Sequence, residues 1–265
     1  AVFPLPDLVA FPGQTVPLHI FEPRYRKMIS DCLEQGMALG VACAEAKVAS
    51  RSHGSQTTEE MLRSNQDTYK AHDVLSYGDV ELKEKLPDGR MIIDVKMKGR
   101  ARIEEMIQNI PYYRAVVEGL PTIKGDPEIT VMELDRLKDL AAILLGNQFD
   151  AYWRQVKDIA KGDPETLLSQ YLHTIRIDTA LQQELLEEDD LNDRIKSFAG
   201  IVENYLSRMG MEIGEELDQI EFTEEDFTGD DNPPITPTAD ASEKTAAEVI
   251  PLFPKEEAAP RKPSR

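Results

Sequence analysis

The spacing of apolar residues divides the chain into a strand-rich first part and a helical second part. Residues 3–12 contain short apolar runs separated by prolines, and residues 16–21 form another apolar run. Gly13 lies between them, where glycine permits a tight turn because it tolerates positive φ. The pattern therefore predicts two strands joined by a Phe11-Pro12-Gly13 turn.

An amphipathic helix is expected directly after these strands. Glu22-Pro23 is typical of a helix start, because proline at the first helical position loses no hydrogen bond and an acid suits the positive helix end. Gly36 is a typical helix stop. Between them, apolar side chains recur at helical spacing, and they are Tyr25, Met28, Ile29, Cys32 and Leu33.

More strands are predicted between residues 37 and 118. Residues 37–44 form a buried apolar strand, and the polar residues 46–72 predict a long loop. Residues 74–82 and 91–99 predict a hairpin around the Leu86-Pro87-Asp88-Gly89 turn. Residues 100–107 and 111–118 follow as two further strands.

From residue 121 the apolar period becomes helical. Residues 131–145 and 148–161 predict two helices. Three aspartate-containing steps mark later helix starts, because aspartate caps a helix N-terminus, and they are Asp163-Pro164, Asp178 and Asp189-Asp190. Beyond residue 211 the chain is acidic, rich in proline and without periodicity, which predicts disorder. We therefore predict an α+β protein with a β domain (1–120), a helical bundle (121–210) and a disordered acidic tail (211–265).

Several motifs resemble the N-terminal, substrate-binding domain of the Lon protease family in order and spacing. In the opening stretch they are Phe11-Pro12-Gly13, Val16-Pro17-Leu18 and Glu22-Pro23-Arg24-Tyr25; later they are Gly78, LPDG (86–89), KGRARI (98–103) and PYYRAVVE (111–118). The resemblance covers residues 1–120 and, more loosely, the helices that follow. It is closer to stand-alone bacterial members than to full-length Lon. It implies a PUA-like β pseudobarrel followed by a helical bundle, and a role in recognising polypeptide.

Charge argues against nucleic acid as the main partner. The formal net charge is −19 over 265 residues, and an acidic protein repels nucleic acid phosphates. The excess lies downstream, since residues 1–120 hold 15 basic and 17 acidic side chains. Cys32 and Cys43 lie in apolar runs and are expected to be buried free thiols. With no charge-free stretch of about 18 residues, we expect a cytoplasmic protein without a membrane partner.

The catalytic motifs of Lon proteases do not occur in this sequence. A Walker A loop needs G-x-x-x-x-G-K-[ST] to hold nucleotide phosphates, and no Gly-Lys-Ser/Thr step occurs. The four histidines lack partners at metal-binding spacing. We therefore expect no enzyme, with no catalytic residues, no cofactor and no metal.

Aromatic residues of the resemblance motifs are the candidates for substrate binding. They are Phe21, Tyr25, Tyr112 and Tyr113, together with Arg24. Core packing is the competing interpretation, and we favour it for Phe21, which ends an apolar strand. Tyr112 and Tyr113 are adjacent, so on a strand they point to opposite faces, and one must face outward or cover a helix.

The function that we expect is non-catalytic recognition of unfolded or degradation-prone polypeptide, as an adaptor or chaperone-like factor in protein quality control. Apolar substrate side chains would enter a groove between barrel and helices, and a sheet edge could pair with an extended chain. A protease or a chaperone is a further candidate partner.

Two other functions stay open. A basic run alternates along one strand, at Lys96, Lys98, Arg100 and Arg102, and could contact RNA phosphates in a PUA-like module, although a solvated sheet face is the commoner explanation. Alternatively, the acidic tail could recruit a partner, which would make the chain a scaffold. The tail contains one apolar island, VIPLFP (249–254), which we expect to dock as an extended ligand on the barrel or on a partner.

Overall fold

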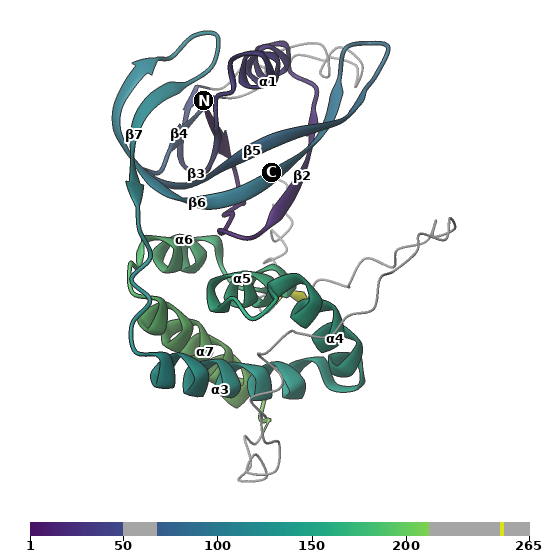
Figure 1. The fold of residues 1–265 in the computed structure, drawn as a ribbon, viewed down its shortest axis with the longest axis vertical. Helices are drawn as coiled ribbons and strands as arrows, with labels where there is room; N and C mark the ends of the chain where they lie inside the picture. Colours follow the sequence, from purple (N-terminus) through teal and green to yellow (C-terminus); the bar gives the residue numbers. More distant parts are fainter. Residues whose placement is uncertain (50–67, 212–249, 252–265) are drawn as a thin grey trace, which may run out of the picture.

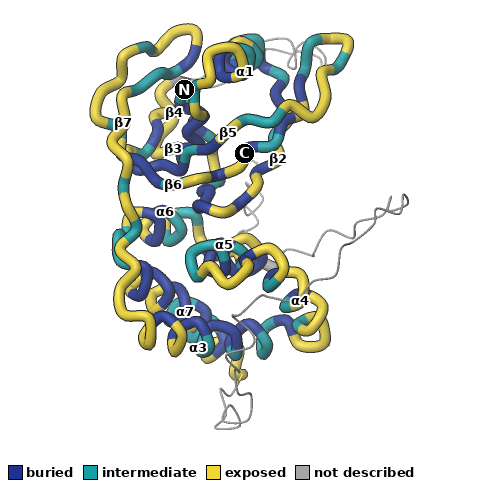
Figure 2. The backbone as a smooth tube through the Cα atoms, viewed as in Figure 1, coloured by how far each residue is buried: buried dark blue, intermediate teal, exposed yellow. Residues whose placement is uncertain are grey.

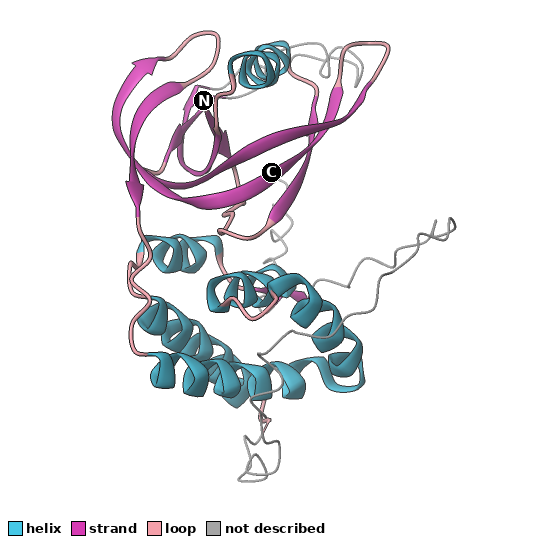
Figure 3. Ribbon diagram, in the orientation of Figure 1, coloured by secondary structure: helices cyan, strands magenta, loops and turns pink. Residues whose placement is uncertain are grey.

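A computed structural model describes residues 1–49, 68–211 and 250–251, and it shows a mixed α+β fold. In residues 1–120, called the sheet half, the described segments 1–49 and 68–120 contain strands β1–β7 and helix α1; residues 121–208, called the helical half, contain the other described helices. Figures 1 and 3 show the sheet half stacked on the helical half, with a single crossing from β7 into the helices.

The sheet half is a curled sheet packed on helix α1. Its elements are β1 (Val2–Leu5), β2 (Thr15–Ile20), α1 (Pro23–Gln35), β3 (Leu39–Ala49), β4 (Thr68–Ala71), β5 (Val74–Lys85), β6 (Met91–Gln108) and β7 (Arg114–Leu120). The strand order is β1-β3-β5-β6-β2, with β4 paired to β3 and β7 to β6. Val2 N donates to Tyr113 O at 2.9 Å in an isolated bridge, which brings β1 back beside the segment that leads into β7.

In the sheet half, the predicted start and end of the helix are confirmed, whereas the predicted loop and the predicted division of the long strand are wrong. Pro23 is the first residue of α1, and Gly36 ends it with φ 64°. The predicted loop 46–72 is shorter than expected, because β3 and β4 occupy both of its ends. β6 is one strand of 18 residues where the sequence predicts two.

Gly78 permits the close approach of β5 to β6. A Cβ added at Gly78 would lie 2.1 Å from the carbonyl oxygen of Lys96, far inside contact distance. The register of the β5–β6 pairing shifts at the same place, between Tyr77 and Gly78. A side chain would therefore force the two strands apart.

Four helices of the helical half begin with a capping aspartate: Asp126 caps the first, α3, and the sequence predicts the other three caps. Its elements are α3 (Pro127–Leu145), η1 (Gly146–Gln148), α4 (Phe149–Ala160), α5 (Pro164–Thr174), β8 (Ile175–Arg176), α6 (Thr179–Glu187) and α7 (Leu191–Arg208). Asp163, Asp178 and Asp190 accept backbone N–H bonds in the first turns of α5, α6 and α7, as their positions predict.

One hydrophobic core joins the two halves. The buried cluster of the helical half also contains Val9, Phe11, Cys43 and Val74 from the sheet half. Figure 2 shows buried backbone on both sides of the junction. Cys32 and Cys43 are buried and free, as predicted. The two halves are therefore packed against each other at these positions.

The Phe11-Pro12-Gly13 turn docks on α5. Gly13 has φ 82°, and a Cβ there would lie 2.7 Å from Thr166 Oγ1. Ser169 Oγ donates to Pro12 O at 2.6 Å, and the Gln14 side-chain amide donates to Ser169 O at 2.8 Å. The motif that carries the family resemblance is therefore an architectural contact between the halves.

Arg100 makes the second polar contact across the junction. Its side chain is fully buried and donates to Leu186 O at 2.8 Å, Glu188 O at 2.9 Å and Pro121 O at 3.2 Å. From the other side, Arg194 donates to Glu188 O at 2.6 Å. Two arginines, one from each half, thus hold the connection between α6 and α7.

The predicted disordered tail lies outside the described residues, except for Ile250 and Pro251. These two residues form strand β9 (Ile250–Pro251), which pairs in parallel with Ile175 and Arg176 of β8. This part of the apolar island is therefore placed beside the helical half, and not on the sheet.

Candidate functional site

Three of the predicted site residues lie together at the start of α1. Arg24 stands over the Tyr25 ring, 4.5 Å from its centroid, and donates to Glu22 and to Thr68, each at 2.9 Å. Burial raises the pKa of Tyr25 to about 12, the nearby Arg24 charge opposes this rise, and Tyr113 is close enough to add a smaller raising effect. The cluster is well packed, and Tyr25 itself belongs to the core. Only Arg24 and Tyr113 keep part of their surface accessible.

Tyr112 faces α1 and is structural. It is buried, and its hydroxyl donates to Asp31 Oδ2 at 2.6 Å. Burial, followed by the bond to Asp31, raises the pKa of Tyr112 to about 12. The same bond, followed by that from Lys27, lowers the pKa of Asp31. The expectation that one tyrosine of the pair covers a helix is confirmed for Tyr112, which lies just before β7.

Phe21 lies apart from this cluster and outside the buried core. Its side chain is half-buried, and its ring lies 6.0 Å from that of His19. The prediction that Phe21 fills a core site is therefore wrong. Its position follows from the turn into α1, where the strand has ended and the alternation of inside and outside residues no longer applies.

The basic run on β6 is mostly neutralised. Lys96 pairs with Glu81 at 2.7 Å, and Lys98 pairs with Asp79 at 2.5 Å. Arg100 is buried in the junction, so only Arg102 of the remaining two is exposed. The interpretation of the run as one solvated face is wrong at Arg100, and the run does not form a continuous phosphate-binding surface.

Among the described residues, the exposed large apolar side chains are most numerous on a hairpin whose strands the sequence predicts but which it does not identify as an exposed apolar surface. Residues 103–118, called the apolar arm, are the hairpin formed by the end of β6 and most of β7 (Figure 1). Its exposed large side chains are Met106, Ile107, Ile110, Val116 and Val117, with Ile110 85% exposed. Figure 2 shows the tip of the arm as exposed backbone. Clustered apolar exposure of this kind marks interaction sites, whereas single exposed residues do not.

A sequence signal for the arm exists. Met106-Ile107 and Val116-Val117 are adjacent apolar pairs, and neighbouring residues on a strand face opposite sides. Since only one side of a hairpin can face its own protein, each pair must place an apolar side chain on the outer side. The pairs therefore indicate exposure once the strands are assigned.

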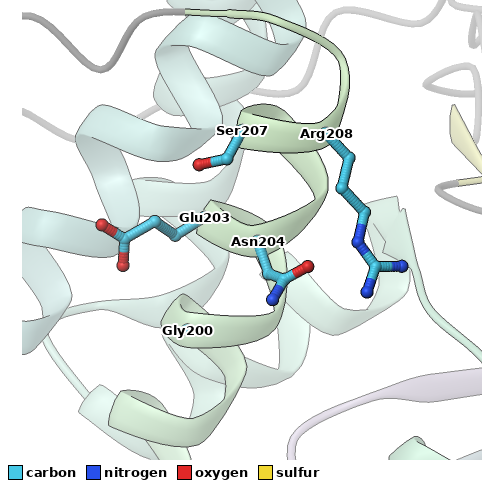
Figure 4. Close-up of a pocket in the computed structure, with 5 residues that line it drawn as sticks. All are labelled: Gly200, Glu203, Asn204, Ser207 and Arg208. Atoms are coloured by element: carbon cyan, nitrogen blue, oxygen red, sulfur yellow. The ribbon is translucent and has the colours of Figure 1, made fainter.

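The other features of the described surface do not suggest chemistry. A hollow of about 500 Å³ lies along α7, and its described lining residues all come from this helix: Gly200, Glu203, Asn204, Ser207 and Arg208 (Figure 4). Within residues 1–49, 68–211 and 250–251, no three His, Cys, Asp or Glu side chains gather as a metal site would require. Over the same ranges, every helix falls short of the length or the hydrophobicity needed to cross a bilayer.

Comparison with known proteins places this architecture in a family. Residues 1–204 match the sequence model of the ATP-dependent protease La (LON) substrate-binding domain, so the chain belongs to that family. It is 27% identical over 197 residues to the Lon protease of Desulfovibrio desulfuricans and 26% identical over 197 residues to that of Cytophaga hutchinsonii. These matches cover 73% of this chain but only 21% and 22% of the relatives, about a fifth of their length.

A solved structure shows the same fold. The N-terminal domain of the Mycobacterium avium complex Lon protease superposes with a TM-score of 0.54 at 17% sequence identity, over 77% of this chain and 97% of that one. The resemblance to the Lon family found in the sequence motifs is thereby confirmed.

Proposed function

We propose that this protein recognises unfolded or degradation-prone polypeptide without catalysing a reaction, as a stand-alone domain in cytosolic protein quality control. The observation that carries the proposal is the apolar arm in a member of the LON substrate-binding family. Exposed apolar segments distinguish unfolded from folded chains, and their burial contributes about 25 cal/mol per Å². A protease or a chaperone that receives the bound chain is the proposed further partner.

The predicted groove between the two halves is a weaker candidate than the arm. The Phe11-Pro12-Gly13 turn, Arg100 and the shared core occupy the junction at several places. The arm projects from the sheet half, away from this junction (Figure 1). We therefore propose the arm, with Tyr113 at its turn end and Arg24 nearby on α1, as the main binding surface. The curled sheet supports the proposed PUA-like pseudobarrel.

RNA binding has less support than polypeptide binding. Lys96 and Lys98 are paired with acidic side chains, and Arg100 is buried, so the basic strand offers few cations to phosphate. The scaffold alternative rests on the tail, which lies outside the described residues.

A titration with a permanently unfolded protein tests the proposal. We expect a reduced and alkylated, fluorescently labelled protein to bind at about micromolar strength, as modest apolar burial allows. Replacing Ile107 and Ile110 by serine on the arm should weaken binding about tenfold or more. A matched variant, with serine at Ile129 and Met132 on the exposed side of α3, should bind as the unchanged protein does.

Equal binding by the arm variant and the α3 variant would show that the arm is not the binding site. No binding by the unchanged protein would end the proposal. Structured RNA serves as the comparison ligand, and tight RNA binding at physiological salt that is lost when Arg102 becomes glutamate would favour the RNA function instead.

A further inference from the structure

The outer edge of β7 is a free and regular strand edge. Among the described residues, β7 pairs only with β6, so the other side of the strand has no ladder partner beyond the bridge at Tyr113. The residues of β7 pair with β6 one after another from Arg114 to Leu120. The two register shifts of this hairpin lie in β6, between Ile103 and Glu105 and between Met106 and Gln108. The strand with the free edge, β7, is therefore regular along its whole length.

Proteins commonly protect such an edge, and this molecule does so along the end of β5. The outer edge of β5 from Asp79 to Lys85 also lacks a described ladder partner. It carries a register shift of its own between Leu82 and Glu84, and exposed charges at Lys83, Glu84 and Lys85. Bulges and charged side chains are the usual means of blocking strand addition. The centre of β7, Ala115 to Val117, has neither a bulge nor a charge.

The two faces of the arm differ in polarity. Cross-strand partners share a face, so Val117 lies with Ile103, and Ala115 lies with Met106. Ala115 and Val117 are two residues apart on one strand, which puts all four apolar side chains on one face. Val116 is on the other face with Glu105, and there Arg114 and Glu118 flank it. A strand added beside β7 would therefore meet an apolar face and a polar, charge-balanced face.

We infer that β7 captures an extended polypeptide segment by strand addition, and that the favoured segment alternates apolar and polar residues. This inference rests on the proposed function and names how the arm performs it. Main-chain hydrogen bonds to residues 115–120 would hold segments of many sequences, while the two faces would select for alternation. Alternation is the pattern of a strand that has lost its own sheet, which is the kind of segment that unfolding exposes.

A pair of matched peptides tests the backbone contribution. The probe is a fluorescein-labelled peptide of about ten residues in which valine and threonine alternate, a typical strand length. Its twin has the same side chains but is N-methylated at positions that remove donors from both edges. We expect the twin to bind at least about tenfold more weakly, because several main-chain hydrogen bonds cannot form.

Hydrogen–deuterium exchange locates the bound peptide, with the β5 edge as internal control. The unmethylated peptide should slow exchange in residues 114–120 and leave residues 79–85 unchanged. Val116→Lys, which adds an edge charge, should weaken binding about tenfold. Glu84→Lys, which also adds a lysine but on β5, should leave it unchanged.

Each other outcome overturns the inference in a distinguishable way. Equal binding of both peptides means that side chains alone hold the substrate, which ends strand addition and leaves the proposed function standing. Slower exchange in β5 and not in β7 would show that the peptide binds at the β5 edge, which contradicts the inference. Failure of both peptides and of the unfolded protein ends the proposed function itself. A dimer in light scattering that protects β7 without peptide would assign the edge to a second copy of the chain.

Discussion

The two hairpins that share β6 are built in opposite ways. The first, residues 79–96, called the charged hairpin, joins the end of β5 to the first half of β6 and is covered with ion pairs. Lys83 bridges Glu81 at 2.8 Å and Asp94 at 3.2 Å, and Arg26 of α1 donates to Asp88 O at the turn. The apolar arm uses the second half of the same strand and exposes valine, isoleucine and methionine instead. Figure 1 shows the two hairpins extending to opposite sides of the sheet half.

This difference suggests a division of roles within one sheet, in which the charged hairpin supports the fold and the apolar arm is available for binding. The charged hairpin has a third strand, β2, on its β6 edge and close backbone packing at Gly78. The arm beyond Arg102 is two-stranded, an arrangement that is marginally stable alone in water. Its turn end is held by Tyr112, which bonds to α1, and by the bridge between Val2 and Tyr113. We therefore expect substitutions to cost most where β6 joins the rest of the molecule, and least along the arm.

The largest effect is expected at Arg100, which lies on β6 between the two hairpins. Arg100→Met should lower the free energy of unfolding by about 2–4 kcal/mol, because it leaves the buried Leu186 carbonyl without this donor and removes the bonds to Glu188 O and Pro121 O. Urea unfolding measures it. Arg102→Met is the control, since Arg102 is exposed, and should change stability by less than about 0.5 kcal/mol. Equal losses in both variants would contradict the junction role.

Gly78 and Gly119 distinguish the two hairpins by their backbone spacing. Gly78→Ala should cost about 1–3 kcal/mol, because the new methyl group meets the Lys96 carbonyl and the strands must separate. Gly119→Ala, on β7 directly after the arm, meets nothing within 4 Å and should be neutral. Thermal melts of the two variants compare them directly, and similar melting temperatures would show that the strands are not closely packed at Gly78.

Tyr112 anchors the turn end of the arm to α1. Tyr112→Phe should cost about 1–2 kcal/mol at neutral pH, because Asp31 loses its hydroxyl donor. The pKa of Asp31 is lowered in the folded protein, so its contribution is present above the ordinary value of 3.8 and is lost as the pH falls through the folded pKa. The gap between variant and wild type should therefore narrow in acid.

The same bond makes a prediction in alkali. The pKa of Tyr112 is raised to about 12 from 10.0, so its contribution is present below pH 10 and is lost as the pH rises toward 12. Unfolding measured across pH should show wild type losing stability there more steeply than Tyr112→Phe. A constant gap at all pH values would contradict the Tyr112–Asp31 bond.

Phe21, next to the β2 strand that supports the charged hairpin, should matter less than a core aromatic. A buried phenylalanine replaced by alanine costs about 3–5 kcal/mol. Because Phe21 is half-buried and outside the core clusters, we expect about 1 kcal/mol from the area that remains buried. A loss of the full core magnitude in a denaturant titration would place the ring in the core after all.

The smallest effect on stability is expected on the arm itself. Val116→Lys should change the free energy of unfolding by less than about 0.5 kcal/mol, as exposed substitutions usually do. Circular dichroism melts check this. A large loss would mean that Val116 supports the fold, and the comparison between a structural hairpin and a binding hairpin would fail.

The sequence by itself determined the features that depend on a few neighbouring residues. Asp163, Asp178 and Asp190 cap helices because each carboxylate reaches an N–H two or three residues ahead. The turns at Gly13 and Gly36 follow from positive φ at those positions, which glycine alone adopts freely. The motifs also identified the family, because they keep their order and spacing.

Only the tertiary structure decided which of the candidate residues are accessible. In the sequence, Arg100 looks like its exposed neighbours, yet its side chain is buried in the junction. The local pattern could not show this, because its acceptors, the carbonyls of Leu186 and Glu188, lie 86 and 88 residues away along the chain. Tyr25 and Tyr112 are also buried, and the sequence could not show this, because burial depends on which distant residues pack against a side chain. The arm stayed exposed because β5 ends its pairing with β6 at Arg102, and alternation along a strand cannot show where a distant neighbour stops.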